Sequence, residues 1–216
     1  SIIALLMSTH SLWCNQQENT TLHVCTVANY QCHKLDILLN SAQHYGLEVE
    51  VAGLDKTYRN NFYKLFRMKE HLKNIPDQDI ILFVDAFDVV LLGNKQQFIE
   101  RFLSFNVPLV FSAERRLFPK HSVHDMKIPY PASSTTFQYL NSGGYIGRAG
   151  YIKIMLDEII SKRYSVPLIR YGRIGSDQFH CHRYFLRNQE SVKLDTMNKI
   201  FVSLAGVNPD EIIIDE

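Results

Sequence analysis

The amino-acid sequence predicts an α/β fold in which a mostly parallel sheet is flanked by helices. From residue 22 onward, segments of strand character alternate with segments of helical periodicity, the pattern of parallel β-α-β units. Residues 80–84 are apolar at every position, as expected of a strand buried on both faces. Two aspartates, Asp85 and Asp88, follow directly, and open α/β sheets bind ligands at the carboxyl ends of their strands.

The first half of the chain supplies a β-α-β-α-β unit, for which right-handed crossovers are expected. Its helices are predicted from apolar residues at helical spacing, and Gly46 is placed to end the first of them. The expected elements are a strand at 22–28, a helix at 32–45, a strand at 47–53, a helix at 61–72 and a strand at 79–84.

The second half is less regular. Residues 115–137 carry several prolines and are predicted as a loop, and a loop this long in a compact domain is more often functional than idle. Ser176 can cap a helix that begins at Asp177. The other expected elements are a helix at 95–104, a strand at 108–113, the segment 139–149, helices at 151–163 and 177–186, and short strands at 192–194, 200–204 and 211–214.

The two ends of the chain differ from its middle. Residues 1–20 join a short apolar block to a polar stretch, and we expect a signal-peptide remnant and polar leader there. A buried strand or a disordered tail is the alternative. Asn19-Thr20-Thr21 is a glycosylation sequon, consistent with a secretory route. Residues 21–216 are expected to form one domain, incomplete at its C-terminus because the chain ends on an apolar run.

Composition excludes some classes of partner. The formal net charge of +1 provides no broad field for nucleic acid or an anionic membrane. No apolar run approaches the roughly 20 residues of a membrane-spanning helix, so no membrane span is expected.

The four cysteines, Cys14, Cys25, Cys32 and Cys181, include no Cys-x-x-Cys pair and fit no zinc-site spacing. Cys25 lies in the middle of a predicted strand and is expected to be a small buried hydrophobe. Cys32 and Cys181 could be bridged or free.

The aspartate pair suggests a metal site. Hard divalent cations prefer oxygen ligands and often join carboxylates to substrate phosphates, so Asp85 and Asp88 indicate a metal–diphosphate site for a nucleotide-linked substrate. The alternative is a strand that ends in solvated acids.

Other nucleotide and nucleophile motifs are missing. No glycine-rich dinucleotide fingerprint follows the first strand, and the sequence contains no Walker A segment and no nucleophile elbow. His180 and His182 lie two residues apart on a predicted helix, a spacing that points them away from each other, so a shared metal is not expected.

Three further features could serve a ligand. The paired glycines of Asn141-Ser142-Gly143-Gly144 allow close backbone approach, and their polar neighbours can bond a sugar or phosphate; a tight turn is the alternative. Asp177 at a helix start could act on a ligand, or it could only stabilise the helix by its interaction with the helix dipole. Lys64 is by default a solvated surface lysine.

Taken in order, the segments resemble those of one known family, the N-terminal glycosyltransferase domain of procollagen-lysine hydroxylases (lysyl hydroxylases). Collagen galactosyltransferases are a more distant match. The resemblance runs from about Leu22 to the end of the chain. The segments are Thr26-Val27-Ala28, Phe83-Val84-Asp85-Ala86-Phe87-Asp88-Val89, Phe111-Ser112-Ala113-Glu114, Leu140-Asn141-Ser142-Gly143-Gly144-Tyr145-Ile146-Gly147 and Asp177-Gln178.

The resemblance implies a GT-A fold, which is a Rossmann-like sheet, with Mn²⁺ and a UDP-sugar donor, UDP-glucose or UDP-galactose. It implies transfer of a sugar, expected to be glucose, to galactosyl-hydroxylysine of collagen in the endoplasmic reticulum lumen. It also implies that downstream domains could form a homo-oligomer.

The resemblance assigns roles residue by residue. Asp85 and Asp88 match metal-binding acids, and Asn141 and Asp177 match the donor-sugar block and an acid at the catalytic centre. The expected donor-binding residues are Lys64 near the diphosphate, Phe87 on the uracil, Val27, Tyr58, Gly143 and Gly144.

Three departures from the family pattern keep alternatives open. Ser176 stands where an acid is usual, Tyr58 is the nearest candidate for a usual tryptophan, and the family's third metal ligand, a histidine, lies beyond the last residue given. The alternatives are a catalytically weak UDP-binding or scaffold module of a lysyl hydroxylase, and a collagen hydroxylysine galactosyltransferase.

Overall fold

The computed structural model describes residues 20–120, 128–162, 175–208 and 210. The expected leader, apart from Thr20, and the strand expected at 211–214 lie outside these ranges.

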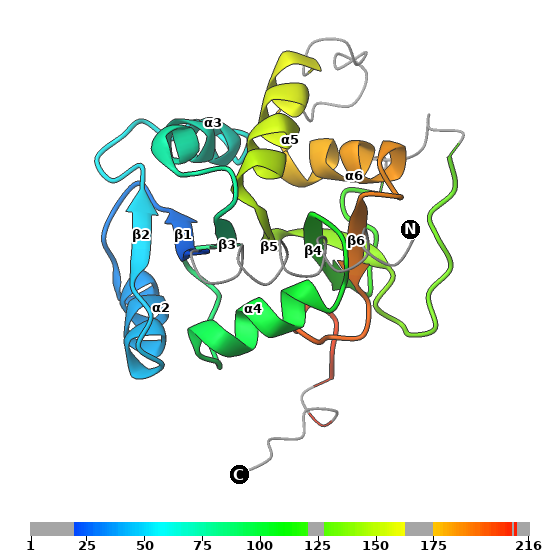
Figure 1. The fold of residues 1–216 in the computed structure, drawn as a ribbon, viewed down its shortest axis with the longest axis horizontal. Helices are drawn as coiled ribbons and strands as arrows, with labels where there is room; N and C mark the ends of the chain where they lie inside the picture. The colour runs from blue at the N-terminus through cyan, green and yellow to red at the C-terminus, as the bar shows by residue number, and fades with distance from the viewer. Residues whose placement is uncertain (1–19, 121–127, 163–174, 209, 211–216) are drawn as a thin grey trace, which may run out of the picture.

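The centre of the molecule is a six-stranded sheet in the order β2-β1-β3-β5-β4-β6 (Figure 1). β5 is antiparallel to both of its neighbours, and every other pair is parallel, which confirms the mostly parallel sheet. The strands are β1 (Leu22–Val27), β2 (Val49–Ala52), β3 (Ile80–Val84), β4 (Leu109–Glu114), β5 (Tyr139–Arg148) and β6 (Val192–Asp195).

Helices cover both faces of this sheet. In Figure 1, α3, α5 and α6 lie above the sheet, and α2 and α4 lie below it. The helical elements are α2 (His33–His44), α3 (Tyr63–His71), the 3-10 turn η1 (Leu72–Asn74), α4 (Lys95–Leu103), α5 (Ala149–Lys162) and α6 (Asp177–Arg187).

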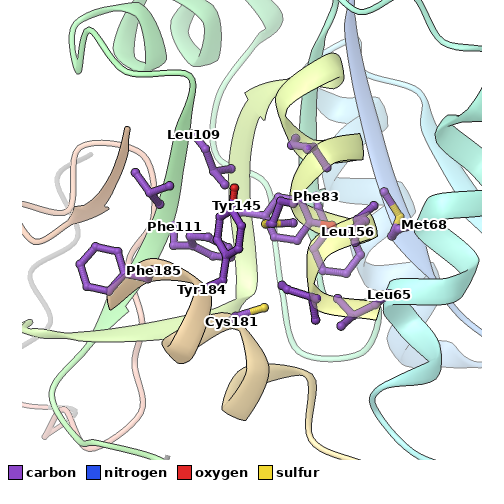
Figure 2. Close-up of a cluster of buried hydrophobic side chains, with 14 of the residues drawn as sticks. Leu65, Met68, Phe83, Leu109, Phe111, Tyr145, Leu156, Cys181, Tyr184 and Phe185 are labelled. Carbon is purple, nitrogen blue, oxygen red and sulfur yellow. The ribbon is translucent and has the colours of Figure 1, made fainter. Parts of the chain in front are cut away.

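The apolar character of β3 follows from its central position. All five of its residues are buried, because one face packs under α3 and α5 and the other packs over α2 and α4. On the first face the ring of Phe83 stacks on that of Tyr145, with centroids 4.7 Å apart. Figure 2 shows this cluster, in which side chains from α3, α5 and α6 converge on β3, β4 and β5. Each buried apolar side chain contributes about 1.5–3 kcal/mol relative to an exposed one.

The order of the strands creates one topological switch point. From β1 the chain crosses through α2 to β2, and then returns through α3 to β3 on the other side of β1. The carboxyl ends of β1 and β3 therefore form the crevice where open α/β sheets bind ligands. Asp85 is the first residue after β3.

The strand expected at 200–204 is wrong, since these residues form no regular element. The buried carboxylate of Asp195 accepts the backbone N–H groups of Lys199, Ile200 and Phe201 at 2.8, 2.6 and 2.8 Å. These donors are thus used by a local side-chain turn instead of a strand ladder.

The helix boundaries follow local capping. The side chain of Asn94 caps α4 and forms a capping box with Gln97. The hydroxyl of Ser176 accepts the backbone N–H of Phe179 at 3.2 Å, which confirms the predicted cap of α6. The predicted helix at 61–72 begins two residues later and ends in the turn η1.

Within the described residues, Cys25, Cys32 and Cys181 are all free thiols, so Cys32 and Cys181 are not bridged. Cys25 is fully buried, as expected. None of the helices in the described ranges combines the length and the apolar character needed to cross a membrane.

Candidate functional site

A charged cluster lies beside the switch point. The ammonium Nζ of Lys64, in the first turn of α3, lies 2.8 Å from Oδ1 of Asp85 and 2.8 Å from Oδ2 of Asp177. Lys64 is 9% exposed and Asp177 only 4%, so Lys64 is not the solvated surface lysine expected by default. The three groups come from α3, the end of β3 and the start of α6.

A close approach of two segments brings α6 to α3. A Cβ at Gly175 would lie 2.7 Å from Cβ of Asn60, so the chain can pass here only without a side chain. The carbonyl of Gly175 accepts the N–H of Phe62 at 2.8 Å, just before α3 begins. This contact sets the first turns of both helices side by side, and Lys64 thereby reaches Asp177.

The negative charge of the cluster exceeds the positive charge. Burial lowers the pKa of Lys64, but Asp85 and Asp177 outweigh it and raise that pKa, so the ammonium stays charged. Burial raises the pKa of Asp85, and the nearby carboxylates of Asp177 and Asp88 add to this effect against the contact with Lys64. Two carboxylates thus contact one ammonium, and the carboxylate of Asp88 acts on Asp85 as well, a balance that favours a further cation.

The glycine pair lies in strand β5 and not in a tight turn. The register passes from Phe111 opposite Tyr145 to Ser112 opposite Asn141, so residues 142–144 bulge without partners in β4. A Cβ at Gly143 would lie 3.0 Å from Oδ2 of Asp85. The first glycine therefore makes room for the Asp85 carboxylate, and its carbonyl accepts the Asp85 N–H at 2.8 Å.

The second glycine makes room for an aromatic ring. A Cβ at Gly144 would lie 2.9 Å from the ring of Phe201. Phe201 is held there by the Asp195 turn. The packing of the 199–201 segment against β5 thus accounts for a small residue at 144.

A hydrogen-bonded layer supports the acids. The hydroxyl of Ser142 donates to Oδ2 of Asp177 at 3.0 Å, and Gln178 Nε2 donates to Oε1 of Glu114 at 2.6 Å. Burial raises the pKa of Glu114, while hydrogen bonds from Gln178 and Asn141 oppose the rise. Asn141 Oδ1 also accepts the N–H of Gly143 at 2.7 Å, which orients the amide toward the bulge.

Gln178 and Glu114 were not expected to be site residues, and Ser142 was expected only as a hydrogen-bonding group for a sugar or phosphate. Each lies in a segment that carries the family resemblance, and two of them are direct neighbours of expected residues. The available signal was adjacency in sequence, but only the packing of α6 on β5 shows that their side chains meet.

The aromatic residues lie near the cluster without joining it. The ring of Phe87 stacks on Tyr30, with centroids 5.1 Å apart and planes 22° apart, and Tyr30 is 52% exposed. Tyr58 donates its hydroxyl to Oδ1 of Asn61 at 2.9 Å. Burial raises the pKa of Tyr58; Lys64 opposes this rise, and the acids of the cluster add to it. The side chain of Val27 is buried under α3, so only its backbone is available to a ligand at the strand end.

The two histidines of α6 point to different neighbours, as their spacing predicted. The ring of His180 packs edge-on against Phe62. His182 hydrogen-bonds the carbonyl of Phe118 at 2.9 Å and the hydroxyl of Tyr130. Burial lowers the pKa of His182 to about 4, so this histidine is neutral. Its two hydrogen bonds attach Phe118 and Tyr130 of the long loop to α6.

The oxygen donors fit a hard divalent cation. Lys64 uses Oδ1 of Asp85, while Oδ2 faces the space that Gly143 leaves open. Asp88 is exposed on the bend that follows and lies close enough to affect the pKa of Asp85. Carboxylate oxygens are the ligands that Mn²⁺ and Mg²⁺ share a preference for. The individual roles of these residues remain predictions.

Comparison with known proteins supplies the family. The sequence profile described as the PLOD GT domain matches residues 18–215. The chain is 28% identical over 203 residues to procollagen-lysine,2-oxoglutarate 5-dioxygenase 2 of Mus musculus and 29% identical over 203 residues to multifunctional procollagen lysine hydroxylase and glycosyltransferase LH3 of Homo sapiens. It is 27% identical over 207 residues to procollagen-lysine,2-oxoglutarate 5-dioxygenase of Drosophila melanogaster.

These alignments cover 89% of this chain but only 26–27% of each relative, so the chain spans about a quarter of their length. The matched profile covers the whole sheet and the whole charged cluster. The chain therefore belongs to the PLOD GT domain family, the glycosyltransferase domain of lysyl hydroxylase-like proteins.

Proposed function

We propose that this chain binds a UDP-sugar together with Mn²⁺ at the switch point and transfers the sugar to an acceptor hydroxyl. The observation that carries the proposal is the pair of 2.8 Å contacts that join Lys64 to Asp85 and Asp177 beside the end of β3. A nucleotide diphosphate needs positive charge, and a buried ammonium that contacts two carboxylates is suited to a site that a metal ion completes.

Each residue has a distinct part in this proposal. Asp85 and Asp88 would hold the ion, which supplies Lewis-acid neutralisation of the diphosphate when bound. Lys64 adds a fixed positive charge near the same phosphates. Asp177, which accepts a hydrogen bond from Ser142, would position or deprotonate the acceptor hydroxyl.

For the donor and acceptor we propose UDP-glucose and galactosyl-hydroxylysine of collagen, as the family resemblance implies. One relative is named as a procollagen lysine hydroxylase and glycosyltransferase, which supports a sugar transfer in collagen modification. The cellular location that suits this substrate is the lumen of the endoplasmic reticulum. In the whole protein, association with a hydroxylase domain and homo-oligomer formation belong to the same proposal.

Calorimetric titration of UDP, with and without Mn²⁺, tests the nucleotide site. We expect binding only with Mn²⁺, and we expect Asp88→Ala to abolish it. Asp157→Ala is the matched control and should bind UDP normally. It removes an exposed acid on α5 that pairs with Lys69 of α3. Unchanged UDP affinity in Asp88→Ala would exclude the metal assignment.

A scaffold module that binds UDP but transfers little is the second candidate. It is favoured by Ser176, which occupies the position of an expected acid and serves as a helix cap. Retained UDP binding without transfer from either UDP-glucose or UDP-galactose would support it. Transfer from UDP-galactose to bare hydroxylysine would instead identify a galactosyltransferase.

A further inference from the structure

A second polar cluster lies under α3, at the opposite end of the helix from Lys64. The Sγ of Cys25, a carboxylate oxygen of Glu50 and a ring nitrogen of His71 all lie within 4.8 Å of one another. Cys25 is fully buried, whereas the side chains of Glu50 and His71 are 39% and 24% exposed. The cluster thus has a buried sulfur and an opening to solvent.

Strand pairing and helix periodicity bring these residues together. The parallel register of β1 and β2 sets Cys25 directly opposite Glu50. His71 ends α3, seven residues after Lys64. Seven residues are about two turns and about 10 Å along a helix, so both side chains face the sheet but serve separate places on it.

Hydrogen bonds hold the carboxylate of Glu50 in position. Its Oε2 lies 2.8 Å from Nε2 of His71, and its Oε1 lies 2.8 Å from Nδ1 of His23. The other ring nitrogen of His23 lies 3.0 Å from Oδ2 of Asp79, whose Oδ1 accepts the N–H of Thr21 at 3.2 Å. A ligand carboxylate supported by an outer histidine and a second acid is the arrangement that orients donors around bound metals.

We propose that Cys25, Glu50 and His71 form a binding site for a borderline-soft divalent cation, Zn²⁺, separate from the site at Asp85. One thiolate, one imidazole and one carboxylate are the ligand types that zinc takes, whereas Mn²⁺ and Mg²⁺ prefer oxygen alone. Three protein ligands leave the fourth tetrahedral position to water, on the side that Glu50 exposes.

Binding must displace a proton from the cluster. Burial raises the pKa of the Cys25 thiol, and the charge of Glu50 raises it further, so the thiol is protonated in the free protein. The cation therefore releases this proton to solvent as it binds. The bound ion would tie β1, β2 and the end of α3 together, and would stabilise the helix that presents Lys64 to the donor.

Titration of the metal-free protein with Co²⁺ tests the site, because thiolate ligation gives a charge-transfer absorption that oxygen ligands do not give. Mg²⁺ is added first to saturate the Asp85 site, so that Co²⁺ binds only at the cysteine site. We expect one Co²⁺ per chain with a thiolate band that Zn²⁺ displaces, and a higher melting temperature with Zn²⁺.

The variants locate the ligands. Cys25→Ser should abolish the band, His71→Gln and Glu50→Gln should weaken or abolish it, and His23→Leu should lower the affinity about tenfold or more. Cys181→Ser, which alters an equally buried free thiol elsewhere, is the matched control and should keep the band. If Cys25→Ser fails to fold, the variants at the partly exposed positions 50 and 71 still show whether these side chains bind the ion.

Two results would overturn the proposal. The first is a folded wild-type protein that gives no thiolate band at one equivalent of Co²⁺. The second is a band that survives in Cys25→Ser, or one that forms in His71→Gln with the same intensity and Co²⁺ affinity as in the wild type. UDP binding with Mn²⁺ depends on neither result, so the proposed function and the proposed zinc site can be rejected independently.

Discussion

The two ends of α3 carry polar clusters of different chemistry. At its first turn, Lys64 lies between two carboxylates, with its ammonium 2.8 Å from an oxygen of each. At its last turn, His71 meets a carboxylate and a buried thiol. One helix face, packed on the same sheet, thus carries both the net-negative cluster that we propose for a metal and a diphosphate and the mixed-donor cluster that we propose for a softer cation. The helical repeat alone separates them, so each can be removed without moving the other.

Removal of Lys64 should give the largest effect. Lys64→Met leaves the buried Asp177 and the partly exposed Asp85 without their shared counter-charge, and breaking a buried pair from one side costs about 3–5 kcal/mol. We expect UDP-sugar transfer to be lost and the free energy of unfolding, measured by urea titration, to fall by this amount.

A double variant at this end of α3 distinguishes the effect of the unpaired charge on stability from the loss of transfer activity. Lys64→Met with Asp177→Asn should recover much of the stability but none of the transfer.

His71→Leu at the other end of α3 should leave Mn²⁺-dependent UDP binding intact. Equal losses of UDP affinity in Lys64→Met and His71→Leu would contradict the separation of the two clusters.

Acid sensitivity should arise away from both clusters, at His182. Its pKa is about 4 in the folded protein and 6.5 as the ordinary value, so between these values the unfolded chain binds more protons. Stability from this group is complete above pH 6.5 and is lost as the pH falls toward 4, by about 3 kcal/mol.

Urea titrations at pH 7 and pH 4 measure this loss. His182→Gln removes the titrating group, and its stability should change less between the same two pH values. An identical pH dependence in wild type and His182→Gln would show that another group is responsible.

The paired glycines should give smaller and different effects. Gly144→Ala forces the ring of Phe201 to move, and such overpacking costs about 1–3 kcal/mol, which Phe201→Leu should partly restore. Gly143→Ala pushes instead on the carboxylate of Asp85, so we expect it to weaken Mn²⁺-dependent UDP binding more than stability. Thermal melts and calorimetry on both variants check this division, which fails if the two substitutions act alike.

The smallest effect is expected at Ser176. Ser176→Ala removes the cap of α6 and should cost about 1 kcal/mol. Ser176→Asp keeps a capping oxygen and restores an acid beside Asp177, so it should preserve stability. A gain in transfer rate with Ser176→Asp would favour the scaffold interpretation of the natural chain, and no gain would argue that Ser176 does not limit activity.

The local elements were predictable because their causes are local. The apolar run of β3 and the periodicity of α2 and α4 correspond to real burial, and Ser176 caps α6 as expected. The strand predicted at 200–204 failed, because one buried side chain, Asp195, took the backbone donors that a ladder would need. This carboxylate precedes the segment whose backbone it holds, so the pattern within the segment does not reveal it.

The sequence by itself determined the α/β class, the position of Asp85 and Asp88 after a buried strand, and the family. The tertiary structure alone decided the antiparallel insertion of β5, its bulge at 142–144, and the contact of Lys64 with both Asp85 and Asp177. It also decided that Cys25, Glu50 and His71 meet. The physical reason is that periodicity encodes which face of an element is buried, whereas contacts between elements depend on register and close approach, which no short segment contains.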